Sequence, residues 1–271
     1  MATIRAVVLR APGTNCDIET ALALERAGAA ADRVHVFALR ASPQALEQYQ
    51  LLVIPGGFSY GDDIAAGKVF ALELARYLWD AIMRFHERGG LILGICNGFQ
   101  VLLKGGFLPD PIGSGSAQAT LSFNDSGRFE DRWVWLDARA GNCPFLAGLD
   151  EEPLFELPVA HAEGRFTVCD PSVLEELLSD RQRGLLRYTL PPQAGGHADP
   201  QVPYPWNPNG SEGNVAGLAD RSGRILGMMP HPERHALWHH HPRWTRSEAN
   251  RSAPPVGQRL FDNAVRWLRR A

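Results

Sequence analysis

The sequence has no excess of positive charge and no long uninterrupted apolar run. Its 27 Lys and Arg residues are balanced by 30 Asp and Glu residues, for a net charge of −3 at pH 7. Proteins that bind a nucleic-acid backbone usually carry a basic surplus, and a membrane-spanning helix needs about 20 apolar residues. The apolar stretch near the start is short and broken by Arg5 and Arg10, which does not fit an export signal. We therefore expect a cytoplasmic protein with no nucleic-acid partner and no membrane segment.

Cysteines are few and widely spaced. The chain has 4 of them, Cys16, Cys96, Cys143 and Cys169, and no C-x-x-C pair. Zinc sites and disulfide frameworks both need cysteines at short recurring spacings. The spacing predicts four free thiols and no metal on this chain.

The first hundred residues alternate between strand-like and helix-like segments. A capped segment over 16–28 and an apolar stripe over 69–88 have helical spacing. The short runs rich in Val, Ile and Leu, which are typical of buried parallel strands, cover 4–9, 34–38, 51–55 and 91–95. Strands that alternate with helices predict a doubly wound α/β fold, a mostly parallel sheet with helices on both faces. At 271 residues, we expect one domain over 1–271.

After Gly105 the pattern changes. Strand-like pieces predict an extension of the sheet with a small antiparallel section; they cover 119–123, 132–137, 157–161, 214–219 and 225–229. Two long segments, about 191–213 and 235–256, lack any helix or strand period. Connections of that length are usually functional, ordered by a partner, or disordered. An amphipathic helix is predicted for GQRLFDNAVRWLRR near the end of the chain.

The stretch GLILGICNGFQVLL places Cys96 between a predicted buried strand and a predicted helix. Glycines at 94 and 98 flank the thiol, as in a strained strand-to-helix elbow that exposes a nucleophile. A helix N-terminus favours a thiolate, and its free N–H groups can bind an oxyanion. The alternative is that Cys96 is a small buried hydrophobe. The motif alone leaves the two readings equally weighted.

A base is predicted in the stretch RILGMMPHPERH. Residues two apart in an extended segment point the same way, so Glu233 can orient the imidazole of His231. By itself, the pair is better interpreted as an incidental ion pair in a solvated loop. Together with Cys96, it favours a nucleophile, a base and an orienting carboxylate.

A third piece, LLVIPGGFSYGDD, ends a predicted strand in two glycines. Backbone amides at the carboxyl edge of a doubly wound sheet lie where such folds bind ligands. Phosphate binding is the alternative, but the Lys-Ser/Thr ending of a P-loop is absent. An oxyanion-binding loop fits the sequence better.

In this order, PGG, GICNGFQ and HPE resemble the class I glutamine amidotransferases. The narrower resemblance is to the glutamine-hydrolysing subunits of phosphoribosylformylglycinamidine synthase, a purine-pathway enzyme. Further motifs that carry it are APGTNCD at 11–17, NDSGRFEDRW at 124–133, PVAHAEGRF at 158–166 and NPNGSEGNVAGL at 207–218. They cover nearly the whole chain, and the fold that the resemblance implies is flavodoxin-like.

The resemblance implies specific roles. Cys96 becomes the nucleophile, His231 the general base and acid, and Glu233 its orienting partner. The backbone amides of Gly57 and Asn97 become the oxyanion hole. Binding of the polar end of L-glutamine is implied for Gln100 and for the segment around His161. Position 162 is Ala where the family more often has Gly, which puts the close approach of that segment to glutamine in doubt.

The resemblance also implies partners. No ATP-binding motif is recognisable in the chain, so ATP and Mg²⁺ are expected on a separate synthetase subunit, accompanied by a small accessory subunit, with no cofactor on this chain. Two alternatives stay open: a non-catalytic regulatory subunit of the same fold, and a cysteine hydrolase of related fold that acts on peptides or small amides. The histidines in 235–256 lack metal-ligand spacing, so we interpret that segment as a surface or partner contact.

Overall fold

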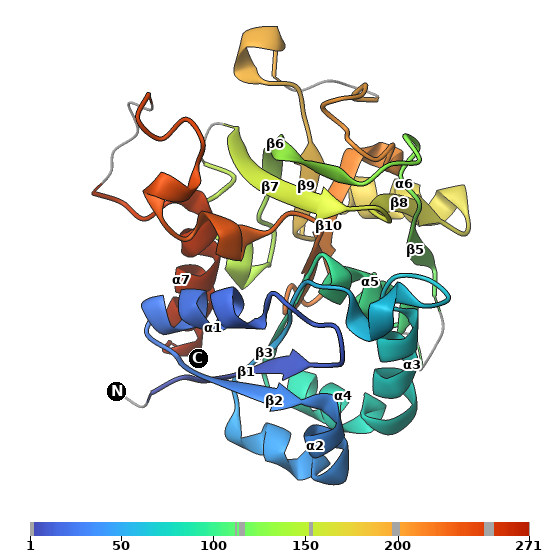
Figure 1. Cartoon of the computed structure of the whole chain (residues 1–271), viewed down its shortest axis with the longest axis vertical. Helices are drawn as coiled ribbons and strands as arrows, with labels where there is room; N and C mark the ends of the chain where they lie inside the picture. Colours follow the sequence, from blue (N-terminus) through green and yellow to red (C-terminus); the bar gives the residue numbers. More distant parts are fainter. Residues whose placement is uncertain are drawn as a thin grey trace.

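The computed structural model is built on one large mixed sheet that runs through the molecule (Figure 1). It describes residues 3–111, 113, 117–151, 154–196, 201–246 and 252–270. The order of the nine strands in the large sheet is β2-β1-β3-β4-β11-β10-β9-β6-β7, and β5 pairs with β8 in a second sheet. The strands are β1 Arg5–Arg10, β2 Ala30–His35, β3 Leu51–Ile54, β4 Leu91–Ile95, β5 Ala119–Ser122, β6 Glu130–Arg139, β7 Phe155–His161, β8 Arg165–Val168, β9 Leu185–Tyr188, β10 Val215–Ala219 and β11 Ile225–Met228.

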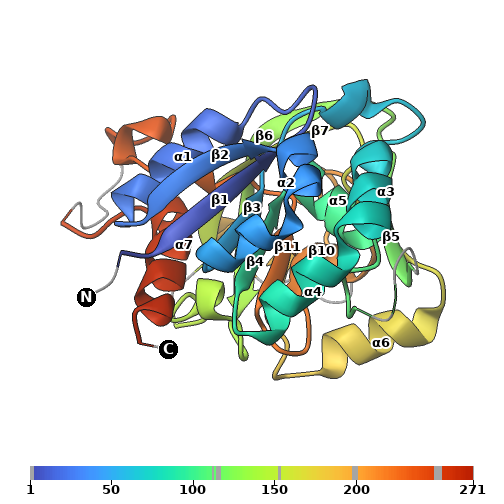
Figure 2. The ribbon, with the colours of Figure 1, turned by 90° about the horizontal axis from the view of Figure 1, so that it is seen from below.

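Helices cover both faces of the parallel half of this sheet (Figure 2). The first and last helices, α1 and α7, pack against each other on one face, while α3, α4 and α5 lie on the other. The helices are α1 Asp17–Arg26, α2 Val36–Ala41, α3 Lys68–Tyr77, α4 Trp79–Glu87, α5 Asn97–Lys104, α6 Pro171–Ser179 and α7 Val256–Leu268. None of these described helices has the length and apolar character that a membrane crossing requires.

Strands β2, β1, β3, β4 and β11 are parallel to their neighbours in that order. Strands β3 and β4 consist of buried residues throughout, as expected for strands covered by helices on both faces. From β1 the chain continues to β2, on one side of β1, whereas from β3 it continues to β4, in the opposite direction across the sheet. Ligands of doubly wound sheets bind outside the carboxyl ends of the strands at such a switch point.

The predicted fold class is confirmed, and so is the antiparallel section. Strands β10, β9, β6 and β7 continue the large sheet through antiparallel pairs. Strands β5 and β8 make a separate antiparallel pair. Buried apolar residues from both halves form one continuous cluster, so the antiparallel section rests on the same core as the parallel strands.

Two segments fold differently from the sequence-based expectation. The strand predicted for 34–38 is β2, which ends at His35, and the residues after it form α2. The Nδ1 atom of His35 accepts a hydrogen bond from the Phe37 amide at 3.2 Å and so caps that helix. The helix predicted for 69–88 is two helices, because Leu78 leaves helical geometry between α3 and α4. The short strands β8 and β9 and helix α6 were not predicted.

The two long segments contain only short helical turns among their described residues. One turn spans Pro192–Ala194 and another Trp238–His240. The segment after His235 lies against β6, β7 and the start of α7. Both segments extend over positions outside the described residues, namely 197–200 and 247–251.

Candidate active site

Cys96 sits on a strained elbow between β4 and α5. Its backbone has φ 50° and ψ −102°, a conformation that a side chain other than glycine adopts only at a cost of about 1–3 kcal/mol. The Cys96 amide donates to the Met228 carbonyl at 2.7 Å, which fixes the turn to β11. A Cβ atom at Gly98 would lie 1.9 Å from the Ile54 carbonyl oxygen, so no residue larger than glycine fits at position 98. The predicted elbow is present.

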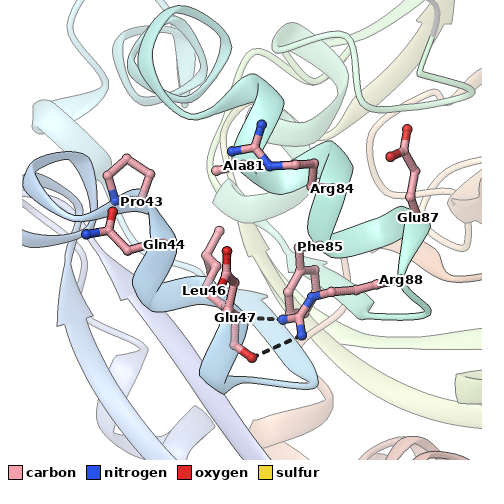
Figure 3. A pocket seen from close by; sticks show the side chains of 9 residues that line it. All are labelled: Pro43, Gln44, Leu46, Glu47, Ala81, Arg84, Phe85, Glu87 and Arg88. Atoms are coloured by element: carbon pink, nitrogen blue, oxygen red, sulfur yellow. Dashed lines mark hydrogen bonds between the residues drawn. The ribbon is translucent and has the colours of Figure 1, made fainter.

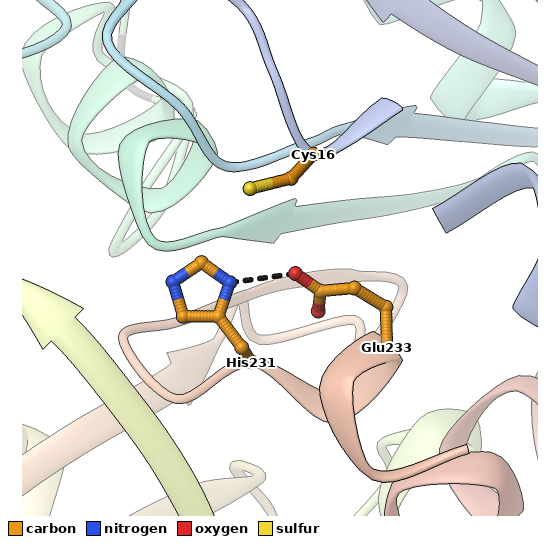
Figure 4. A group of neighbouring side chains, drawn as sticks. All are labelled: Cys16, His231 and Glu233. Atoms are coloured by element: carbon orange, nitrogen blue, oxygen red, sulfur yellow. Dashed lines mark hydrogen bonds and ion pairs between the residues drawn. The ribbon is translucent and has the colours of Figure 1, made fainter. Parts of the chain in front are cut away.

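His231 and Glu233 lie at the carboxyl end of β11, the strand that pairs with β4. Their side chains meet through Nδ1 of His231 and Oε1 of Glu233 at 2.6 Å (Figure 4). Both residues are at most 2% exposed. The other ring nitrogen, Nε2, is buried and has no hydrogen-bond partner within the described residues. The carboxylate therefore orients the ring and leaves Nε2 available for proton transfer.

The surroundings of His231 act on its pKa in opposite directions. Burial disfavours the charged ring, but the carboxylate of Glu233, and after it the charge on Cys96, favour it. The net result is a pKa well above the ordinary value of histidine. Because Cys96 is close enough to act on the pKa of His231, the two predicted catalytic side chains share one site. An imidazolium in this position can donate a proton to a leaving group.

Gly57 and Asn97 supply backbone amides at the same edge of the sheet. Gly57 has φ 137°, and a Cβ there would lie 2.7 Å from the Asn15 amide nitrogen, so the loop after β3 requires glycine. Among the described residues, neither the Gly57 nor the Asn97 amide donates a hydrogen bond to the protein. The Asn97 side chain is fully used, because it accepts from the Ser59 hydroxyl at 2.6 Å and donates to Asp62 at 3.1 Å. Only the backbone N–H of Asn97 is therefore left without a partner among the described residues.

Gln100 and His161 lie near these groups but are held by protein partners. The Gln100 amide donates to the Glu163 carbonyl at 2.6 Å and accepts from Asn97 at 2.9 Å. Burial, followed by the charge of His231, lowers the pKa of His161 to about 3, so its ring is neutral. Next to it, the Ala160 carbonyl accepts from the Cys96 thiol at 3.5 Å. Direct binding of a substrate by Gln100 or His161 stays a prediction.

A second thiol, Cys16, lies beside the His231–Glu233 pair, which the sequence alone did not predict. One potential ligand atom from each of Cys16, His231 and Glu233 falls within 4.8 Å of the others (Figure 4). Burial is the main cause that raises the pKa of Cys16, and Arg234 donates to its sulfur at 3.2 Å. A metal would have to displace both this cation and the His231–Glu233 hydrogen bond, so the group fits proton transfer better. The signal available in the sequence was that APGTNCD follows β1, at the edge where the other site loops meet.

The loops around the site are joined by a buried ion pair. Lys104, at the end of α5, contacts Glu163 at 3.3 Å and donates to the Ala66 carbonyl at 2.6 Å. Glu163 accepts in turn from the Ala66 amide at 3.0 Å. Both side chains are 9% exposed, and burial lowers the pKa of Lys104 despite the carboxylate beside it. This pair holds the loop after β3 and the loop after β7 against the helix that begins at Cys96.

We expect Lys104→Met to destabilise the protein by about 3 kcal/mol, because it leaves the Glu163 carboxylate buried without its cation. The double variant Lys104→Met/Glu163→Gln should lose less than the sum of the two single variants, since no uncompensated charge remains. Urea unfolding of the four proteins measures this coupling. Replacement of the more exposed pair Arg40 and Glu73 is the control, with an expected effect below about 1 kcal/mol. Strict additivity at Lys104 and Glu163 would contradict the expectation.

Comparison with known proteins agrees with this geometry. The family described as a CobB/CobQ-like glutamine amidotransferase domain matches residues 3–268. Subunit PurQ of phosphoribosylformylglycinamidine synthase from Dehalococcoides mccartyi is 44% identical over 270 residues, which cover 99% of each chain. The PurQ subunit from Picrophilus torridus is 43% identical over 234 residues, 86% of this chain and 88% of the relative.

A solved structure is similar over the same extent. A chain in the structure of PurLQS from Thermotoga maritima has a TM-score of 0.70 and 30% identity, and the match covers 98% of this chain and 100% of that one. At this coverage the match extends over both the parallel and the antiparallel half of the sheet. The chain belongs to the family of CobB/CobQ-like glutamine amidotransferase domains, together with the PurQ subunits of phosphoribosylformylglycinamidine synthase.

Proposed function

We propose that this chain is the glutaminase subunit of a phosphoribosylformylglycinamidine synthase in purine biosynthesis. It hydrolyses L-glutamine to glutamate and delivers ammonia to a synthetase subunit. The observation that carries the proposal is that Cys96, on its strained elbow after β4, and the buried His231–Glu233 pair, after β11, lie at the carboxyl ends of neighbouring strands. The family and the full-length relatives support the same activity.

In the first half of the reaction, the Cys96 sulfur attacks the side-chain amide carbon of glutamine, and the thiol proton passes to Nε2 of His231. The negative charge that develops on the amide oxygen is bound by the Gly57 and Asn97 amides. The C–N bond then breaks while His231 returns its proton to the nitrogen. Ammonia leaves, and a thioester joins Cys96 to the substrate.

In the second half, water attacks the thioester carbon, and His231 takes a proton from it. The same two amides stabilise the second oxyanion. The C–S bond breaks, the thiol recovers the proton, and glutamate leaves. Glu233 keeps the ring of His231 in one orientation through both halves, so one residue acts as base and acid in turn.

Ammonia becomes protonated in bulk water and then cannot attack, so we propose that it reaches the partner's active site without entering solvent. The synthetase subunit would use it, with ATP and Mg²⁺, to convert formylglycinamide ribonucleotide to its amidine. We also propose a small accessory subunit in the complex. Cytoplasmic location follows from the pathway and belongs to this proposal.

On the substrate side, we propose that the polar end of glutamine lies near Gln100 and the segment around His161. Both side chains already have protein partners, so contact with substrate requires an exchange of hydrogen bonds or the use of nearby backbone groups. The buried Asn124, which donates to the His161 carbonyl at 2.9 Å, holds that segment in place.

A chloroketone analogue of glutamine tests the assignment. Incubated with the chain and a co-expressed synthetase subunit, it is expected to label one cysteine per chain, and peptide mass spectrometry should place the label on Cys96. Excess glutamine should protect that cysteine, while an asparagine-length analogue should react far more slowly.

Labelling at Cys16, Cys143 or Cys169 would overturn the site. Labelling at Cys96 without any release of glutamate from glutamine, even in the complex, would reject the activity and favour a regulatory subunit. Cleavage of peptides at a rate that the glutamine analogue leaves unchanged would favour a cysteine hydrolase of the same fold.

A further inference from the structure

The outward face of β6 and β7 carries an aromatic surface that the glutaminase reaction does not use. Trp133 and Trp135 project from one side of β6, opposite the buried Val134, and Trp135 is the cross-strand neighbour of Glu156. The segment 235–246, which follows His231 and Glu233 in the chain, lies on this face. Its His241 ring meets Trp133 edge to face, with ring centroids 4.4 Å apart.

A cavity of about 750 Å³ lies between this face and the segment 235–246. Three tryptophans contribute to its walls: Trp135, Trp238 and Trp244. A second hollow of about 350 Å³ adjoins it and shares the Glu156, His241 and Arg243 side chains with it. Ligand sites in proteins are usually concave, of this size, and lined mainly by apolar and aromatic groups with a few polar ones.

His235 lines this cavity with unused hydrogen-bonding capacity. It is 5% exposed, and within the described residues neither ring nitrogen has a partner. Burial, followed by the neighbouring His241 and His240, lowers its pKa to about 4, so the ring is neutral and offers one donor and one acceptor. Buried polar groups are nearly always paired, so this enclosed histidine in the cavity wall can gain a hydrogen bond from a ligand once a neighbouring ring moves aside.

The charged groups around the cavity favour an anion. Arg243, Arg246 and Arg259 line it, against the single carboxylate of Glu156. That carboxylate accepts from both Arg243 and His241, so a carboxylate of the protein already occupies one anion position. Arginine binds phosphate and carboxylate groups well, and its planar head also stacks on aromatic rings.

The other cavity of similar size lacks these features (Figure 3). It measures about 590 Å³ and lies between α4 and the turn before β3, near the amino ends of the strands. Its Arg88 already donates to the carbonyls of Leu46 and Glu47. No tryptophan lines it, and none of its lining side chains has a buried polar atom without a partner.

We propose that the cavity between β6, β7 and the segment 235–246 binds a planar aromatic molecule that carries an anionic group, with nucleoside monophosphates as the class that fits. The tryptophans stack on the ring, Arg246 holds the phosphate, and His235 reaches the edge of the ring or the sugar when a neighbouring side chain moves aside. The site is separate from that of glutamine, although His235 follows Glu233 by two residues.

Isothermal titration calorimetry with the full chain tests this, with AMP and GMP as the probes. We expect one nucleotide per chain, with adenosine and inorganic phosphate each binding at least about tenfold more weakly, because each lacks one half of the recognised chemistry. Arg246→Gln and Trp238→Leu should each weaken nucleotide binding about tenfold. Arg84→Gln, in the cavity of Figure 3, is the matched control and should change nothing.

Circular dichroism of each variant confirms that it is folded. If neither nucleotide binds at millimolar concentration, the proposal is wrong. Inorganic phosphate binding as tightly as AMP would also overturn it, because only charge would then be recognised. Nucleotide binding that survives both Arg246→Gln and Trp238→Leu would place the ligand elsewhere on the chain.

Discussion

Cys96→Ser is expected to reduce glutamine hydrolysis by more than about 10⁴-fold, because the hydroxyl is a far weaker nucleophile for the same proton-transfer partner. The replacement is nearly isosteric, and the elbow is fixed by the hydrogen bond from the Cys96 amide to Met228, so the fold should persist. Release of glutamate from glutamine, measured in the complex with the synthetase subunit, gives the rate. Thermal unfolding of the variant shows whether the fold is kept.

Two controls separate loss of chemistry from loss of assembly. The Cys96→Ser complex should still convert substrate when ammonia is supplied directly at alkaline pH, because that reaction bypasses the glutaminase site. Cys169→Ser, which removes an exposed thiol, should leave glutamine hydrolysis unchanged. Glutamine-dependent synthesis that survives in Cys96→Ser would reject the nucleophile assigned here.

Glu233→Gln is expected to lower the rate of glutamine hydrolysis by about 10²–10⁴-fold. The carboxylate both orients the ring of His231 and is the largest cause that raises its pKa. Without it, burial dominates, and the pKa of His231 falls. The variant should therefore lose the protonated ring at lower pH than the native protein, and the basic limb of its pH–rate profile should move to lower pH.

The raised pKa of His231 also determines how the free energy of unfolding changes with pH. A histidine whose pKa is raised by folding stabilises the native state fully below its unfolded pKa, and this contribution is lost as pH rises through the folded value. In the native protein that loss falls well above the ordinary histidine range, because the folded pKa of His231 lies there. Unfolding of Glu233→Gln in urea should show this stabilisation missing at neutral pH.

A matched control lies elsewhere in the molecule. His86 and Asp220 form another buried histidine–carboxylate pair, with Nε2 and Oδ2 3.4 Å apart, on α4 and the turn after β10. Asp220→Asn should cost stability yet leave the pH–rate profile in place. An unchanged profile in Glu233→Gln would mean that Glu233 neither orients nor charges the catalytic ring.

Local patterns predicted the parallel half of the fold well. Buried strands and amphipathic helices reveal themselves by composition and period, and β1, β3, β4 and α7 fall where those patterns lie. The elements that the sequence did not predict correctly also have a local cause. Apolar residues continue past His35 into α2, so strand and helix look alike there, while β8 and β9 are only four residues long and each contains an arginine, which leaves no clear apolar run.

The sequence by itself determined the elbow at Cys96, the His231–Glu233 pair and the family, because each depends on residues close together in the chain or on motifs in a fixed order. Only the tertiary structure decided that Cys16 lies beside His231, that Lys104 pairs with Glu163, and that His241 packs against Trp133 of β6. These contacts join residues from about 60 to more than 200 positions apart. Strand order and register set such distances, and no local pattern encodes them.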